Sequence, residues 1–196
     1  SMAKAITAAE RDGIASHGLA YLATYCEHLQ CGKVVGAAVP ALTEPSPGAV
    51  VVDAGSGFAH PAIDLGLSRL LPVARKQGIA TLNIRNSYNC GVLGHHTERI
   101  AEAGLIGLGF TNAPASIAPS GGRKAVVGTN PWSLAVPDGK GGIAIAIDQS
   151  ASVVAARIGT PGQSLCTASA RELVPPGQEQ ALVTPFGVAQ PAHSEG

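Results

Sequence analysis

The sequence predicts an α/β fold, and three observations support this prediction. Only 13% of the 196 residues are charged and 25 are glycine, a composition that favours an α/β domain with tight turns over a solvated helical bundle. Short apolar runs typical of strands alternate with stretches in which apolar residues recur at helical spacing. A strand, a helix and a second strand follow one another over 79–111, an order that is typical of a βαβ-like unit.

The N-terminal part of the chain predicts two helices separated by a short junction. Residues 3–11 are rich in alanine and permit a helix, and a second helical pattern ends at Gly32. Apolar residues at helical spacing define this second pattern: Leu19, Leu22, Cys26 and Leu29. Ser16 lies where a helix-entry residue is expected, and His17 lies at the junction itself. Both side chains are therefore expected to be free to face a cleft.

The rest of the chain predicts strands, two helices and a tail. Pro40 to Gly48 contains three prolines and is expected to be a loop, and the helix over 63–77 is expected to break near Pro72. Beyond Arg157 neither periodicity is clear, which predicts a poorly structured tail. The expected elements are strands over 49–54, 79–85 and 105–111, helices over 63–77 and 94–104, and a hairpin of 132–137 with 142–148.

Composition and charge limit the kinds of partner. Thirteen basic and thirteen acidic residues give a net charge of zero, which argues against nucleic acid or an anionic membrane surface as partner. No apolar run approaches the roughly 20 residues of a membrane span. The four cysteines show no C-x-x-C spacing and are expected to be buried free thiols in a reducing cytoplasm. A small molecule is therefore the expected partner.

Glycine-rich motifs in the chain resemble nucleotide-binding loops only superficially. "GSG" at Gly55 to Gly57 and "GLGF" at Gly107 to Phe110 do not complete G-x-G-x-x-G. "DGKGG" at Asp138 to Gly142 lacks the spacing of a phosphate loop. Close backbone packing explains the first two motifs, and a hairpin turn explains the third.

The histidines outside the junction give no metal site. His95 and His96 are adjacent, so on a helix they point in different directions and cannot share a metal ion as an i, i+4 pair could. A metal hydrolase is therefore a remote alternative, and no metal is expected. His60 and His28, the latter expected on an exposed helix face, receive no role.

Three loops are unusually rich in small polar residues, glycine and proline. They cover 86–96, 111–122 and 128–137, and each follows or joins an apolar strand. Rigid loops of this composition are typical of ligand-facing segments. An ordinary turn explains any one of them alone, but three at the ends of neighbouring strands favour a ligand site.

These motifs, in this order, resemble the type-2 malate/L-lactate dehydrogenase family. The resemblance rests on "AERDGIASHG", "NSYNCGVLGHH", "AEAGLIGLGFTNAPASIAPSGG", "GTNPWSLAVP" and "IAIAIDQSAS", and it covers nearly everything from Ala3 to about Arg157. It implies a non-Rossmann fold with a mixed NAD(P)-binding sheet and flanking helices. It also implies a homodimer that uses NAD or NADP to interconvert a small 2-oxo acid and the corresponding 2-hydroxy acid.

The resemblance implies roles for particular residues. His17 matches the proton donor and acceptor at the substrate C2 oxygen, with Ser16 as its relay, and Thr129 matches a substrate-contacting threonine. Hydride transfer leaves an alkoxide that needs a nearby acid with a pKa near the working pH, a role that suits imidazole. The segments that match cofactor contacts are Cys90, Gly91, Val92, Leu93 and Gly94, and Ile147, Asp148 and Gln149, with Asp148 expected to bind ribose hydroxyls.

Three positions depart from the family pattern. Tyr21 stands where an arginine clamps the substrate carboxylate, and a phenol cannot replace a bidentate guanidinium. Asn89 stands where a histidine is common, and Arg157 where the imine reductases of the family have an aspartate. Two explanations stay open: the substrate differs from lactate and malate, or the chain is a truncated, catalytically inactive binding or assembly module.

The resemblance also divides the chain. Residues 1–80 are expected to be the N-terminal part of the substrate domain, 81–157 the NAD(P)-binding sheet domain, and 158–196 a diverged tail. Family members are longer, so the C-terminal portion of the family is expected to be missing.

Overall fold

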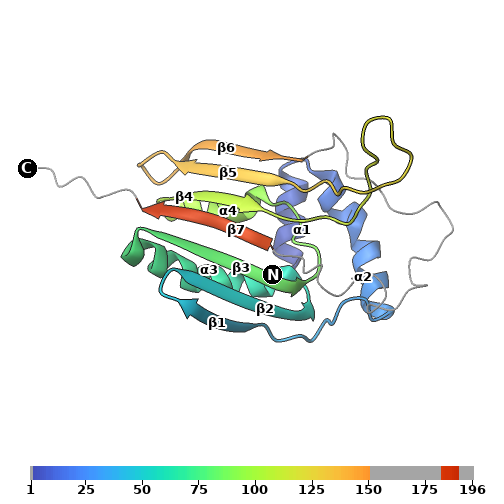
Figure 1. Ribbon diagram of the computed structural model, residues 1–196, viewed down its shortest axis with the longest axis horizontal. Helices are drawn as coiled ribbons and strands as arrows, with labels where there is room; N and C mark the ends of the chain where they lie inside the picture. Colours follow the sequence, from blue (N-terminus) through green and yellow to red (C-terminus); the bar gives the residue numbers. More distant parts are fainter. Residues whose placement is uncertain (1, 151–181, 190–196) are drawn as a thin grey trace, which may run out of the picture.

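The computed structural model describes residues 2–150 and the backbone of 182–189, which together form an α/β fold around one mixed sheet (Figure 1). The seven strands follow the order β1-β2-β3-β7-β4-β5-β6. They are β1 (Ala41–Ser46), β2 (Ala49–Gly57), β3 (Ile79–Ser87), β4 (Leu105–Phe110), β5 (Trp132–Pro137), β6 (Ile143–Gln149) and β7 (Leu182–Ala189). The helices are α1 (Met2–Arg11), α2 (Leu22–Gln30), α3 (Ala59–Gln77) and α4 (Gly94–Glu102), with short 3-10 helices at Ala15–His17 and Leu19–Tyr21.

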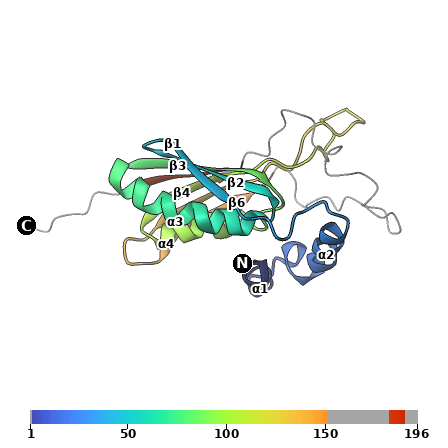
Figure 2. The ribbon, with the colours of Figure 1, turned by 90° about the horizontal axis from the view of Figure 1, so that it is seen from below.

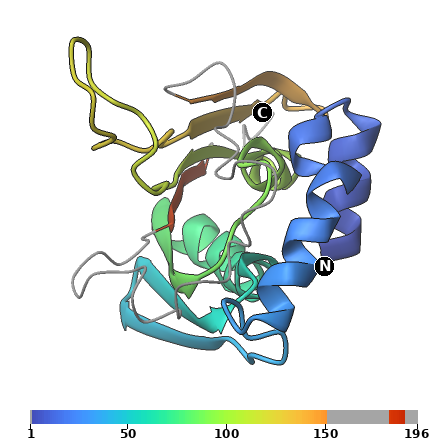
Figure 3. The ribbon, with the colours of Figure 1, turned by 90° about the vertical axis from the view of Figure 1, so that its right-hand side faces the viewer.

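The helices form two groups around the sheet. Figure 2 shows α3 and α4 covering the same face of the sheet. Figure 3 shows α1 and α2 together at one end of the sheet, away from that layer. Among the described helices, none is long and apolar enough to span a membrane.

The sheet is built from strand–helix–strand units. β2 and β3 are parallel neighbours, with Ala49 opposite Thr81 and Asp53 opposite Arg85, and α3 connects them. The predicted unit over 79–111 is also present as β3, α4 and β4, but β7 lies between its two strands and pairs antiparallel with both. The predicted hairpin is confirmed by the antiparallel pairing of β5 with β6. In its turn, the Asp138 side chain accepts hydrogen bonds from the backbone N–H groups of Lys140 and Gly142.

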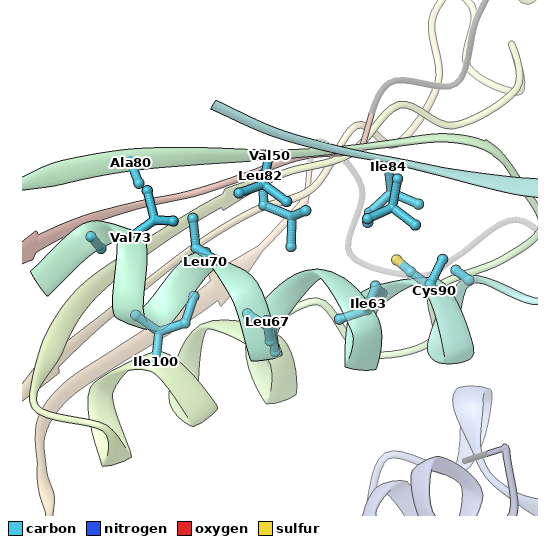
Figure 4. Close-up of a cluster of buried hydrophobic side chains, with 14 of the residues drawn as sticks. Val50, Ile63, Leu67, Leu70, Val73, Ala80, Leu82, Ile84, Cys90 and Ile100 are labelled. Atoms are coloured by element: carbon cyan, nitrogen blue, oxygen red, sulfur yellow. The ribbon is translucent and has the colours of Figure 1, made fainter. Parts of the chain in front are cut away.

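The core lies between the sheet and α3. Over the first six residues of β2 and of β3 every second residue is buried, which is the period of a strand with one face against a core. Residues of α3 spaced by three or four, including Ile63, Leu67 and Leu70, belong to the same buried cluster as these strand residues, and Leu70 points toward the strands (Figure 4). Burial of each such side chain contributes about 1.5–3 kcal/mol of transfer free energy.

Two predictions about prolines are wrong. The expected loop at 40–48 contains strand β1, which lies at the sheet edge, and Pro45 falls at the register shift between Thr43 and Ser46, where a proline costs no ladder hydrogen bond. The helix expected over 63–77 begins at Ala59 and continues past Pro72. Pro61 is tolerated in its first turn because the N–H groups there have no helical partner.

The prediction of a poorly structured tail is wrong for 182–189. These residues form β7 in the middle of the sheet, opposite Leu82 and Ala80 of β3. Pro185 falls inside the register shift between Leu82 and Ala80, so the strand accommodates it at a bulge. Proline and glycine within 182–189 interrupt the alternating apolar pattern that is typical of a strand, so the sequence did not predict one here. Residues 158–181 and 190–196 lie outside the described part of the chain.

Close packing explains the glycine motifs, as predicted. A Cβ atom at Gly107 would lie 2.7 Å from the carbonyl oxygen of Thr97, so α4 lies directly on β4.

The prediction of buried free thiols is confirmed for Cys90 but is wrong for Cys26, which is free and exposed, and for Cys31, which is disulfide-bonded. Cys166 lies outside the described residues.

Candidate functional site

The Ser16–His17 pair lies in the first 3-10 helix, at the predicted junction between α1 and α2. The Ser16 hydroxyl is 2.9 Å from Nδ1 of His17, and this helix start has no side-chain cap, so Ser16 is bonded to His17 and is not a helix cap. Glu10 accepts a 2.6 Å hydrogen bond from the backbone N–H of Leu19 across the turn. A Cβ atom at Gly18 would lie 2.0 Å from that carboxylate oxygen, so a larger residue there would require the flexible Glu10 side chain to move.

The surroundings of His17 combine burial with opposing charges. Burial lowers the pKa of His17, the Asp148 carboxylate raises it, and His95 lowers it. Asp148 also accepts a 2.7 Å hydrogen bond from the backbone N–H of Gly94, at the positive N-terminal end of α4. The structure therefore brings the end of β6 and the start of α4 to the predicted histidine.

A histidine–carboxylate hydrogen bond links the N-terminal helices to α4. Nε2 of His95 lies 2.9 Å from the Asp12 carboxylate, which follows the last residue of α1. His96 points elsewhere, because its Nε2 lies 2.8 Å from the carbonyl oxygen of Cys90. The prediction that the two adjacent histidines point in different directions is confirmed.

The predicted cofactor segment Cys90 to Gly94 forms a tight loop before α4. Gly91 has φ of 70°, a conformation that favours glycine, and its N–H donates a 2.6 Å hydrogen bond to the Asn89 side chain. The Asn89 side chain thus stabilises this loop by accepting a hydrogen bond from a backbone N–H two residues further along. Burial raises the pKa of the Cys90 thiol to about 11, so the thiol stays protonated near neutral pH.

Only some of the predicted site residues line a common cavity. A cavity of about 100 Å³ lies between α4 and the β5–β6 hairpin. Its lining contains Gly94, Ile147 and Asp148 from the predicted cofactor segments, together with Thr97, Glu98, Ser133, Leu134 and Ala146. Ligand pockets for drug-sized molecules are typically about 300–1,000 Å³, so this cavity holds one moiety of a dinucleotide at most.

Thr129 lies in the loop before β5, which is held against residues near Ala113. The Asn130 side chain accepts a 2.9 Å hydrogen bond from the N–H of Ala113, and a Cβ atom at Gly128 would lie 2.0 Å from the carbonyl oxygen of Ala113. Among the described residues, neither Thr129 nor the exposed Gln149 forms a hydrogen bond with His17, whose ring contacts Ser16.

An aromatic cluster beside the site was not predicted. The expectation that His28 is exposed is wrong: 3% of it is accessible, and its Nδ1 makes a short hydrogen bond with the Tyr88 hydroxyl. Tyr25 packs edge-to-face on Tyr21 and Tyr88 with ring centroids 4.9 and 6.0 Å apart. Tyr21, Tyr25 and His28 follow the i, i+4, i+7 spacing of one helix face, which was the available signal in the sequence.

A buried histidine pair lies under the cofactor segment. The rings of His60 and His96 are 5.7 Å apart, and both side chains are about 5% exposed. Both ring nitrogens of His60 and Nδ1 of His96 have no hydrogen-bond partner among the described residues. Burial lowers the pKa of His60 to about 3 and that of His96 to about 4, so both are neutral in the folded protein near neutral pH.

This pair predicts a loss of stability between pH 7 and pH 5. The unfolded histidines bind protons at a pKa of about 6.5 and the folded ones do not, so the unfolded state gains protons first as pH falls. We expect the free energy of unfolding to fall by about 2 kcal/mol for each histidine, measured by urea unfolding at both pH values. The variant His60→Phe should lose about half of this pH dependence, and equal stability of the wild type at pH 5 and 7 would contradict the prediction.

Comparison with known proteins shows the family to which this α/β chain belongs. Residues 1–159 match the family model described as malate/L-lactate dehydrogenase. The chain is 41% identical over 175 residues to a (2R)-3-sulfolactate dehydrogenase (NADP(+)) from Chromohalobacter salexigens, covering 89% of this chain and 50% of that protein. It is also 41% identical over 137 residues to a Delta(1)-pyrroline-2-carboxylate/Delta(1)-piperideine-2-carboxylate reductase from Pseudomonas aeruginosa, covering 70% of this chain and 41% of that protein.

The chain therefore belongs to the malate/L-lactate dehydrogenase family. The crystal structure of delta1-piperideine-2-carboxylate reductase from Pseudomonas syringae is similar with a TM-score of 0.74 and 36% identity, covering 79% of this chain and 46% of that one. The predicted family and its mixed-sheet fold are thus confirmed. The chain spans about half the length of the curated relatives it matches.

Proposed function

We propose that this chain contributes to an NAD(P)-dependent oxidoreductase that interconverts a small 2-oxo acid and its 2-hydroxy acid, with His17 as general acid and base. One observation carries the proposal: a half-buried histidine lies between a serine hydroxyl and the field of an aspartate at a helix N-terminus. The names of the relatives, a sulfolactate dehydrogenase and cyclic-imine carboxylate reductases, support the same class of substrate.

The residues near Gly94 fit one part of a nicotinamide cofactor in their chemistry. The Asp148 carboxylate has two oxygens, so it can accept a ribose hydroxyl while Oδ2 accepts the N–H of Gly94. The loop Cys90 to Gly94 and the strand end Ile147 to Gln149 would hold this part, and the small cavity between them would take it. The nicotinamide supplies hydride to the substrate C2 when it is bound.

Residues of this chain would transfer the proton to and from the substrate. Protonated His17 donates to the C2 oxygen during reduction and accepts the proton back during oxidation. Ser16 fixes the ring through Nδ1, which leaves Nε2 to face the substrate. Asp148 favours the imidazolium form and so offsets part of the effect of burial on the pKa of His17.

Substrate contacts of Thr129, Tyr21 and Asn89 belong to the same proposal, as do a homodimer, a cytoplasmic location and domain boundaries near residues 80 and 157. A second candidate is an inactive binding or assembly module. It is favoured by Tyr21 in place of the expected arginine and by Asn89, whose side chain serves its own loop.

The test is a fluorescence titration of the purified chain with NADH and NADPH, repeated with pyruvate, oxaloacetate and a cyclic imine carboxylate. Saturable binding followed by loss of the reduced-cofactor signal supports the oxidoreductase. Binding of neither cofactor rejects it in favour of the inactive module, and measurable turnover of any of the three acids rejects the inactive module.

A further inference from the structure

His95 joins two parts of the site that lie far apart in the chain, and the proton transfer described above gives it no role. It is the second residue of α4 and directly follows Gly94, whose N–H binds Asp148. Its Nε2 lies 2.9 Å from the carboxylate of Asp12, 83 positions earlier in the chain. The two side chains are 18% and 35% exposed, so water reaches this contact only in part.

Asp12 belongs to the stretch of backbone that carries His17. The N–H of Asp12 donates a 3.0 Å hydrogen bond to the carbonyl oxygen of Ala8 in α1. The backbone then turns at Gly13, whose φ of 73° favours glycine. The N–H of His17 donates a 3.0 Å hydrogen bond to the carbonyl oxygen of Ile14. A displacement of Asp12 therefore reaches His17 through a short stretch of hydrogen-bonded backbone.

Two groups orient the carboxylate of Asp12. Nε of Arg11 lies 3.0 Å from Oδ1, and His95 lies against Oδ2. The hydrogen bond from Arg11 lowers the pKa of Asp12, burial opposes this effect, and the hydrogen bond from His95 lowers the pKa further. Asp12 is therefore ionised near neutral pH. Because an ionised carboxylate only accepts hydrogen bonds, Nε2 of His95 carries a proton and donates it to this bond.

This contact affects position more than stability. A partly exposed pair of this kind typically contributes about 0–1 kcal/mol to the free energy of unfolding. A displacement of about 1 Å at a reacting group, however, can lower the rate of a reaction by about 100-fold. The contact between Asp12 and His95 therefore matters chiefly through the place that it gives His17 relative to Gly94.

His95 also acts on His17 through its charge. Burial lowers the pKa of His17, the Asp148 carboxylate at the end of β6 raises it, and His95 at the start of α4 lowers it. These two are the titratable side chains that act on His17 among the described residues. Removal of the His95 ring should therefore change the titration of His17, which a contact remote from the site would not do.

We propose that His95 and Asp12 are positioning residues, whose hydrogen bond holds the turn carrying His17 against the cofactor segment Cys90 to Gly94. This inference rests on the proposed function and adds to it two residues that do not touch the substrate. The hydrogen bond fixes the distance between the proton donor and the start of α4, and the charge of His95 adjusts the proton affinity of the donor.

The test uses steady-state reduction with NADPH of whichever acid the wild type reduces fastest among pyruvate, oxaloacetate and Delta(1)-piperideine-2-carboxylate. His95→Leu removes the hydrogen bond, so kcat should fall about 10–100-fold while the Kd of NADPH stays within about threefold. His95→Gln places an amide N–H near the position of Nε2, so kcat should stay within about threefold of wild type. Glu102→Leu, the matched control at the exposed end of the same helix, should leave kcat unchanged.

A double variant tests whether the two residues act together. Asp12→Ala and His95→Leu remove the same hydrogen bond, so the double variant should lose no more kcat than either single variant. Circular dichroism shows whether each variant is folded, and Asp12→Ala repeats the test from the exposed side of the contact. Losses that multiply in the double variant overturn the inference.

The pH profile is a readout that a merely structural contact would not move. Because His95 lowers the pKa of His17, both His95→Gln and His95→Leu should move the fall of kcat/KM to higher pH. This direction is opposite to the one expected for Asp148→Asn. A profile that neither variant moves overturns the inference.

The outcomes separate this inference from the proposed function. If the wild type reduces one of the acids and His95→Leu keeps its kcat, the positioning role is wrong and the proposed function stands. If the wild type reduces none of the three acids, the proposed function is wrong and the inference falls with it.

Discussion

Replacement of His17 by glutamine is expected to lower kcat for reduction of a 2-oxo acid by about 10²–10⁴-fold, the usual contribution of a general acid. Glutamine can still bond to the Ser16 hydroxyl, which lies 2.9 Å from the ring nitrogen in the wild type, but it cannot supply a proton. Steady-state kinetics and an NADPH titration should show this loss in kcat with the cofactor Kd unchanged. A kcat within threefold of wild type would show that another group protonates the substrate.

Leu19→Gln is the matched control for this variant. It introduces the same side chain two residues further along, at a position that is 62% exposed. Its kcat should equal that of the wild type. An equal loss in both variants would indicate that the turn between the two 3-10 helices had been disturbed and that the proton donor had not been tested.

The pH dependence of the reaction supplies a second check with a defined sign. Reduction requires protonated His17, so kcat/KM should fall as pH rises through the pKa of His17, which lies below its ordinary value of about 6.5 because the ring is partly buried. Asp148 raises this pKa, so Asp148→Asn should move the fall to lower pH. A shift to higher pH would contradict the electrostatic role of Asp148.

Local sequence signals predicted much of the scaffold because each acts over few residues. Gly32 and Gly78 end α2 and α3 with positive φ, and the turn of Asp138 joins the predicted hairpin. The order of motifs carried the family assignment, which needs no knowledge of packing. The strand β7 was missed because Pro185 breaks the local pattern, and only pairing with β3 and β4 compensates for it.

The site was predicted less completely because it depends on contacts between distant segments. His17 and Asp148 are 131 positions apart in the chain, and nothing in the spacing of either indicates their interaction. Periodicity placed His28 on an exposed face, but Tyr88 from the loop after β3 covers it. Which helix face is buried depends on the partner that folds against it, and a single helix pattern does not contain that information.

The strongest expected effect on stability lies at the contact of α3 with β3. Leu82 is fully buried, and a Cβ atom at Gly66 would lie only 2.5 Å from its terminal methyl carbon, so the leucine occupies the space that the glycine leaves. Leu82→Ala should lower the free energy of unfolding by about 2–5 kcal/mol, because it removes buried methyl groups and leaves a cavity. Urea unfolding followed by circular dichroism measures the change, and the exposed Leu22→Ala should change it by less than about 0.5 kcal/mol.

The reverse change at Gly66 should interact with the first. Gly66→Ala alone forces a methyl group into Leu82 and should cost about 1–3 kcal/mol, less about 1 kcal/mol gained from the better helix former. In the double variant the new methyl enters the space that Leu82→Ala vacates, so the combined loss should be smaller than the sum by about 0.5–3 kcal/mol. Additive losses would mean that the two residues do not share this space, and that the core between α3 and β3 relaxes independently around each of them.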